Sequence, residues 1–191
     1  AMRDEVVGLT SQLILEKEKT LGDVLGDTST LTQNTTLSGT AQWSDFSNSD
    51  PIGDSATARD TIMDGCGMAP NVAIMSYKYN QTGGLNNDEL AVALGVKKII
   101  RSDAMYESAA EGQSSSLAPC FGKNTIFAVV PERANPYQVS LGYRIQQSAP
   151  RRVYKYAQSN PPGSFCVLVE DNYDLFLSNV KAAYLVKNCV A

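Results

Sequence analysis

Few side chains in this 191-residue chain could carry out chemistry, because the sequence contains no histidine. Its absence removes Ser-His and Cys-His nucleophilic pairs, histidine metal ligands and the usual proton shuttle. Four cysteines (Cys66, Cys120, Cys166 and Cys189) lie far apart with no C-x-x-C pair. This spacing favours neither a zinc site nor a redox motif. We therefore expect buried free thiols, no metal and no cofactor.

Asp50 and Asp54 are spaced like a pair of carboxylates that bind a metal or act as acid and base. The residue that follows Asp50 favours a structural role. Asp50 followed by Pro51 is typical of a helix N-cap with proline at the first helical position. Asp54 would then complement the helix dipole, and no catalytic residue is expected here.

Three glycine- or serine-containing motifs could in principle form a binding or catalytic site. "PCFGKN" (119–124) lacks the earlier glycine and the Ser or Thr after the lysine that a phosphate loop needs. "GCGMAP" (65–70) follows a predicted helix, so it indicates a helix end and a turn. Ser38 of "TLSG", with Lys78 or Lys123 as base, keeps a histidine-free Ser-Lys hydrolase open as an alternative function. Such a base must lie within about 3 Å of the hydroxyl.

Composition and charge narrow the function classes. The chain is 43% hydrophobic and 19% charged, as in ordinary soluble globular proteins. A net charge of −4 argues against a protein whose main task is to grip nucleic acid. We expect the basic side chains Arg144, Arg151, Arg152 and Lys155 on the exposed face of strands. No apolar run approaches the roughly 18–20 residues of a membrane span, and an intracellular protein is expected.

The first half of the chain predicts helices alternating with strands. Residues 2–25 form an amphipathic helix about 35 Å long, which should act as a strut. A polar loop over 27–38 leads to Trp43. A second helix begins at Pro51 and ends near Asp64, stopped by Gly65.

Further elements complete an α/β lobe. "APNVAIMSY" contains a strand buried on both faces, and a short helix capped near Asn87 ends at Gly95. "VKKIIRS" is the next strand, and "TIFAVV" (125–130) follows a linker over 108–116. Five later segments, each bounded by a break, predict a small antiparallel sheet: "VSLGYRIQ", "RRVYKYAQ", "FCVLVED", "DLFLSN" and "AYLVKNCV".

The order of "LILEKEK", "DTSTLTQNTTLSGTAQWSDFSNSDPIGD", "APNVAIMSYKYN" and "ELAVALGVKKIIRSDAMY" resembles that in the major capsid proteins of tailed bacteriophages and related prophages. The match is strong from Leu13 to Tyr106 and weak afterwards. The resemblance implies an α+β chain with the Hong Kong 97 coat fold, in which a long spine helix and a peripheral antiparallel sheet adjoin an α/β axial lobe. It places residues 1–40 and 138–191 in the peripheral lobe and 41–137 in the axial lobe. Members of the family also have an N-terminal arm and a long two-stranded extension before the spine helix, and the resemblance leads us to expect neither within residues 1–191.

The function implied by the resemblance is structural. The subunit would assemble with copies of itself, as hexamers and pentamers, into an icosahedral shell around phage DNA. Scaffold, protease and portal proteins are possible partners during assembly, with weak contact to DNA and none to a membrane. The protein would be part of the virion, assembled in the bacterial cytoplasm, and would not be an enzyme. Another virion protein, of the tail or a decoration protein, is the remaining alternative.

Five residues are expected to be structural anchors: Trp43, Asp50, Pro51, Pro70 and Asn71. Trp43 is expected to anchor the crossing from the spine helix to the axial lobe, because its ring buries area that its small neighbours cannot. An ordinary core tryptophan without a role in assembly is the alternative. By the resemblance, Pro70 and Asn71 open a core strand of the axial lobe.

Overall fold

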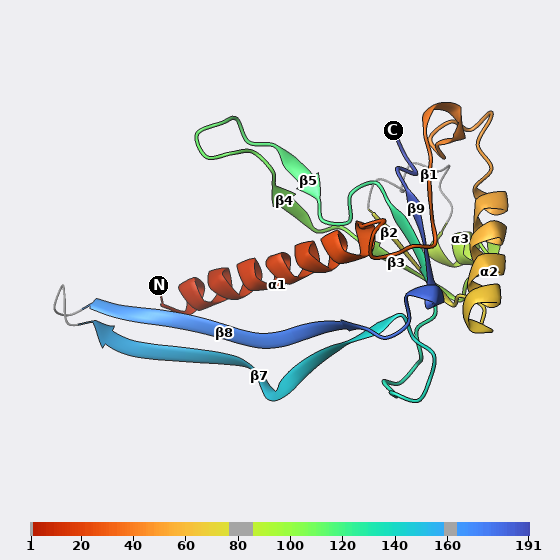
Figure 1. Ribbon diagram of the computed structural model, residues 1–191. Coiled ribbons are helices and arrows are strands. Elements are labelled where there is room, and N and C mark those ends of the chain that lie inside the picture. The colour runs from red at the N-terminus through yellow and green to blue at the C-terminus, as the bar shows by residue number, and fades with distance from the viewer. Residues whose placement is uncertain (1, 77–85, 159–163) are drawn as a thin grey trace.

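The computed structural model describes residues 2–76, 86–158 and 164–191. A long helix, α1 (Met2–Gly26), lies beside a long hairpin made of β7 (Gly142–Gln158) and β8 (Ser164–Leu177). Both project to one side of a mixed sheet, and helices α2 (Pro51–Cys66) and α3 (Asn87–Ala93) lie at the other end of the molecule (Figure 1). The fold is therefore α+β, as the sequence predicts, and it is strongly elongated.

Helix α1 is the long helix that the sequence predicts, and its burial differs between its two halves. Its C-terminal half packs on the core: Leu25 is buried, and a Cβ on Gly22 would lie 2.2 Å from the carbonyl oxygen of Cys120. Its N-terminal half is exposed, with Val7 at 59% and nothing within 4 Å of a Cβ on Gly8. The sequence spacing alone does not distinguish these halves, because both carry apolar residues at helical intervals.

The central sheet has the order β1-β9-β6-β2-β3. Its strands are β1 (Asn34–Thr36), β2 (Val72–Ser76), β3 (Lys98–Ser102), β6 (Thr125–Ala128) and β9 (Ala183–Lys187). Pairing is parallel for β1–β9 and β2–β3, and antiparallel for β2–β6 and β6–β9.

Both faces of this sheet are covered. One cluster joins residues of β2, β6 and β9 to Ala58 and Ile62 of α2 and to Leu90 of α3. A second cluster joins Ile126 and Leu185 to the end of α1 and to the turn at Phe121, among others. The four residues of β6 are all buried. The expected strand buried on both faces is confirmed for β2, and the core strand expected within 125–130 is β6.

Several predicted bounds are corrected. The expected loop 27–38 contains β1, since Asn34–Thr36 pair with β9. Helix α2 continues past Gly65 to Cys66, and the left-handed residue that ends it is Gly67, with φ 74°. The N-cap of α3 is Asn86, whose side chain forms a capping box with Glu89. The linker 108–116 connects β4 (Met105–Glu107) to β5 (Leu117–Pro119) in a hairpin that projects from the body.

The prediction of a small antiparallel sheet made of five short segments is wrong. Four of those segments merge into the two long strands β7 and β8, which form a two-stranded sheet with each other among the described residues. The register shifts between Gln146 and Arg151, so a β-bulge absorbs the residues that the sequence presented as a break. The fifth segment becomes β9 and lies in the central sheet, not beside the hairpin. The lobe boundaries at 40/41 and 137/138 stay predictions.

Candidate functional site

The described side chains with possible chemical roles do not form a common catalytic or metal site. All four cysteines are free thiols, as expected. The expected burial is confirmed for Cys120 and Cys189, whereas Cys66 and Cys166 are partly exposed. Within the described ranges, no group of three or more acidic or cysteine side chains could hold a metal ion. Ser38 and Lys123 share no hydrogen bond in the described part of the chain, and Lys78 lies outside it. Nor is any described helix both long and apolar enough for a membrane span.

Trp43 ties three segments together. Its side chain is 2% exposed, and its indole Nε1 donates a hydrogen bond to Asp54 Oδ2 at 2.6 Å. Its backbone N–H donates to the carbonyl of Cys189 at 2.7 Å. Trp43 thus connects the segment after β1 to the first turn of α2 and to the segment after β9. Asp54 accepts the hydrogen bond of the indole N–H, a role that its position near the helix N-terminus did not reveal.

The other expected anchors lie at the ends of elements. Asp50 accepts a hydrogen bond from the N–H of Gly53 at 2.9 Å, and Pro51 is the first residue of α2. Pro70 is buried before β2. The Asn71 side chain accepts from the N–H of Val130 at 2.9 Å and donates to its carbonyl at 2.6 Å. These two bonds hold the start of β2 against the segment that follows β6.

An acidic turn at residues 44–50 presents an exposed aromatic ring. Phe46 is 73% exposed. Beside it, the Asp45 carboxylate accepts hydrogen bonds from the Asn48 amide at 3.0 Å and from the N–H of Ser47 at 3.0 Å. These bonds, that of Asn48 first, lower the pKa of Asp45. The Ser49 N–H also donates to the Asp45 carbonyl at 3.0 Å, so this turn is tied down although it lies at the surface.

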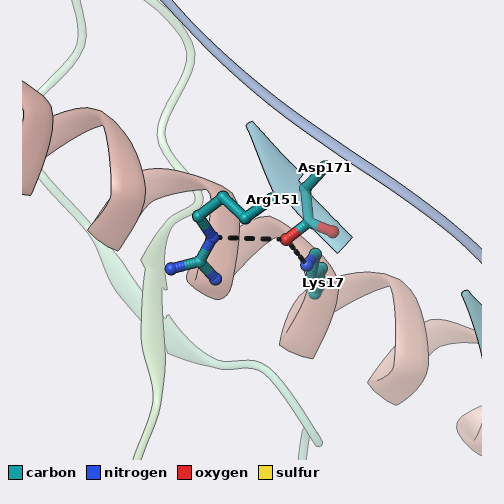
Figure 2. A network of polar contacts seen from close by, with 3 residues as sticks. All are labelled: Lys17, Arg151 and Asp171. Carbon is teal, nitrogen blue, oxygen red and sulfur yellow. Dashed lines mark hydrogen bonds and ion pairs between the residues drawn. The ribbon is translucent and has the colours of Figure 1, made fainter. Parts of the chain in front are cut away.

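A three-residue ion-pair network links the hairpin to α1 (Figure 2). Asp171 of β8 has a side chain only 3% exposed, and its Oδ2 binds Lys17 Nζ of α1 and, at 3.4 Å, Arg151 Nε of β7. Lys17 also lies over the Tyr173 ring, 4.7 Å from its centroid. The bond from Lys17 and then the contact with Arg151 lower the pKa of Asp171. We call this network the latch. No local sequence signal indicated it, because its members are far apart in the chain.

Next to the latch, a groove of about 370 Å³ opens between α1, the edge of the central sheet and the hairpin. Its apolar lining comes from α1, β2, β3, the turn before β6 and β8: Ile14, Leu21, Ile74, Ile100, Phe121, Tyr173 and Leu175. Its charged lining is four cations and one carboxylate: Lys17, Arg101, Arg144, Arg151 and Glu18. Glu18 accepts a hydrogen bond from the Ser102 hydroxyl at 2.8 Å. The groove is thus mainly apolar, with a positive rim.

The predicted basic cluster lies on β7, and all four of its residues are exposed, as expected. The cluster is nevertheless divided by the strand: Arg151 pairs with Asp171, while the next residue, Arg152, pairs with Glu170 on the opposite face. Two of the four, Arg144 and Arg151, line the groove.

Exposed apolar side chains are spread over the projecting elements. On one face of the hairpin, Tyr154 (40% exposed) pairs with Leu168 (49%), and Tyr156 (52%) lies two residues further along β7. On other elements, Val92 is 80% and Leu117 63% exposed. Single exposed apolar residues are common on soluble proteins, but adjacent ones often indicate a surface that another molecule covers.

Comparisons with known proteins find similar folds among solved structures. No protein-family model matches the sequence, and no curated protein does. A crystal structure of a phage-related protein from Bordetella bronchiseptica matches with a TM-score of 0.81 and 24% identity over 96% of this chain. A chain from Mycobacterium phage Che8 matches with a TM-score of 0.60 and 10% identity over 100% of this chain. This chain spans 65% of the length of each. The α+β fold is thus shared with phage-related proteins.

Proposed function

We propose that this chain is a major capsid protein with the Hong Kong 97 coat fold, which assembles with copies of itself into an icosahedral shell around phage DNA. The observation that carries the proposal is the fold shared with a phage-related protein at a TM-score of 0.81. The resemblance of the segments from Leu13 to Tyr106 to phage major capsid proteins supports the same family. The proposed location is the virion, after assembly in the bacterial cytoplasm.

The shape of the molecule fits a shell subunit. A shell needs rigid subunits with large contact edges, and such contacts are repeated by symmetry. Here a long helix, a long hairpin and the β4–β5 hairpin project from a compact sheet (Figure 1). Large apolar side chains on these elements are exposed in the single chain, as with Phe165 at 59% and Leu117 at 63%. Contact with neighbouring copies would remove this surface from water.

The charge of the protein is compatible with weak contact to packaged DNA. Tight binding to phosphates depends on clusters of Lys and Arg. The chain has 16 basic and 20 acidic residues, so the net charge is −4. We propose copies of this chain, in hexamers and pentamers, as the main partners. Scaffold, protease and portal proteins would act during assembly, and no catalytic role or membrane contact is proposed.

The test is expression of the complete gene in bacteria, followed by sedimentation and electron microscopy of the product. Closed icosahedral shells are expected. Tubes, or monomers that stay dispersed at high concentration, would contradict the proposal, and tubes would favour a tail protein. Trp43→Ala is a suitable control, because a subunit with a disrupted core should form no regular particles even when it is expressed.

A further inference from the structure

The acidic turn at residues 44–50 has the properties of a docking element. Phe46 is 73% exposed, yet its neighbours are fixed by the hydrogen bonds to Asp45. An aromatic side chain on an ordered turn has little backbone freedom left to lose when it binds, which favours association. The turn carries Asp45 and Asp50 and has no Lys or Arg. It therefore presents an apolar ring within negative charge.

The groove beside the latch has the complementary properties. Its floor is apolar, and four of its five charged lining residues are cationic. Counting Asp171, which binds two of those cations, still leaves the lining positive. Arg144, on the hairpin, is an exposed member of this rim. A groove of about 370 Å³ with apolar walls has room for a phenyl ring.

We propose that the acidic turn of one copy docks into the groove of a second copy, with the Phe46 ring against the apolar floor and the carboxylates of the turn facing the cationic rim. The choice of a second copy as occupant rests on the proposed function, and the charge complementarity of the two surfaces supports it. Opposite charges at such a contact set the orientation of the partners more than their affinity.

The positions of the two surfaces predict the symmetry of the contact. The acidic turn lies between η1 (Gly39–Ala41) and α2, at one end of the molecule (Figure 1). The groove is lined by residues of α1, the central sheet and the hairpin. Different patches meet, so the contact is heterologous. Heterologous contacts produce rings when the rotation between subunits closes. The proposed contact would therefore build closed rings of subunits.

The first test places a photo-reactive benzoylphenylalanine at position 46 of the purified protein and illuminates it at concentrations where it associates. We expect links between copies, mapped by mass spectrometry to the groove segments 14–21, 100–102 or 173–175. A mixture of isotopically light and heavy chains distinguishes links between copies from links within one. Links that map elsewhere, or that occur only within one chain, would overturn the proposal.

The second test uses variants. Phe46→Ala should raise the concentration needed for association by about tenfold or more, because burying a phenyl ring contributes that much. Tyr137→Ala, which removes a ring that is 96% exposed, is the matched control and should leave that concentration unchanged. Arg144→Glu should weaken association, and Ser47→Lys in the same chain should restore part of it.

The outcome separates this inference from the proposed function. If shells form and neither Phe46→Ala nor Arg144→Glu shifts the association concentration, the docking is wrong and the capsid proposal stands. If the links map to the groove in rings or small oligomers but no shells form, the docking stands and the capsid proposal is wrong.

Discussion

The central sheet and the arm formed by α1 with the β7–β8 hairpin are stabilised in different ways. In the sheet, every residue of β6 is buried, as are four of the five in β9. In the hairpin, residues 151–157 of β7 are all exposed. An isolated two-stranded hairpin is marginally stable in water. The hairpin therefore depends on its contact with α1, through the latch and the packing around it, whereas the sheet is stabilised by its own core.

The difference indicates which mutations should change folding and which should change association. Substitutions in the sheet region remove packed contacts and should lower the free energy of unfolding. Substitutions of exposed arm residues should leave the single chain stable and alter how it binds other molecules. Substitutions at buried positions and at exposed positions test this division.

The largest effect is expected at Trp43. Trp43→Ala should lower the free energy of unfolding by about 3–5 kcal/mol, because it leaves a cavity and removes the donor that bonds Asp54. Urea unfolding followed by circular dichroism measures this. Phe46→Ala, three residues away, removes an exposed ring and should change stability by less than about 0.5 kcal/mol. Equal losses of stability for both variants would contradict the assignment of Trp43 to the core and of Phe46 to the surface.

The two glycines of α1 offer a test within one helix. Gly22→Ala should destabilise the protein by about 1–3 kcal/mol, since the new methyl group would meet the Cys120 carbonyl oxygen at 2.2 Å. That oxygen belongs to the backbone and cannot rotate away. Thermal unfolding of the variant gives the measurement. An unchanged melting temperature would mean that α1 does not pack closely on the turn at Cys120.

The latch predicts that the stability of the protein depends on pH in the acidic range. The pKa of Asp171 is lowered below its ordinary value of 3.8 in the folded protein, so its contribution to stability is complete above about pH 5. That contribution is lost as the pH falls through the lowered pKa. Asp171→Asn should cost about 1.5 kcal/mol at pH 7, because Lys17 loses its charged partner.

Hydrogen exchange in β8 measures the opening of the hairpin in this variant. We expect faster exchange for Asp171→Asn at pH 7 and a smaller change on acidification than in the wild type. Asp174→Asn, an exposed carboxylate on the same strand, serves as the control. If both variants exchange alike, the latch does not hold the hairpin to α1.

A smaller effect, of the opposite sign, is expected at Gly8. Gly8→Ala lies in the exposed half of α1, where a Cβ would meet nothing within 4 Å. Alanine has a higher helix propensity than glycine, so the variant should be stabilised by about 0.5–1 kcal/mol. A rise in melting temperature checks this, and a loss of stability would mean that the N-terminal half of α1 is packed more closely than the structure shows.

Local patterns predicted the elements whose signals are local. The spacing of apolar residues predicts α1, the Asp50-Pro51 pair predicts the start of α2, and a short apolar run predicts β2. These signals lie within a few residues of each other and depend on backbone preference and burial. Errors at helix ends were small, as with Gly67 in place of Gly65.

Pairing between distant segments could not be predicted in the same way. Three polar residues, Asn34–Thr36, form β1 only because β9 lies next to them. The breaks inside β7 and β8 have the composition of turns, but cross-strand pairing continues beyond them. The latch and the groove depend on this pairing, since Lys17, Arg151 and Asp171 come from three separate elements. Periodicity carries no information about such partners.

The position of β9 has a consequence during synthesis. This strand fills the space between β1 and β6, and its residues pair with segments that leave the ribosome long before it. Until residue 187 has emerged, the nascent chain holds β6 with one open edge, and such edges attract other strands. The central sheet can thus be completed only after β9 has been translated, when most of residues 1–191 have already been made.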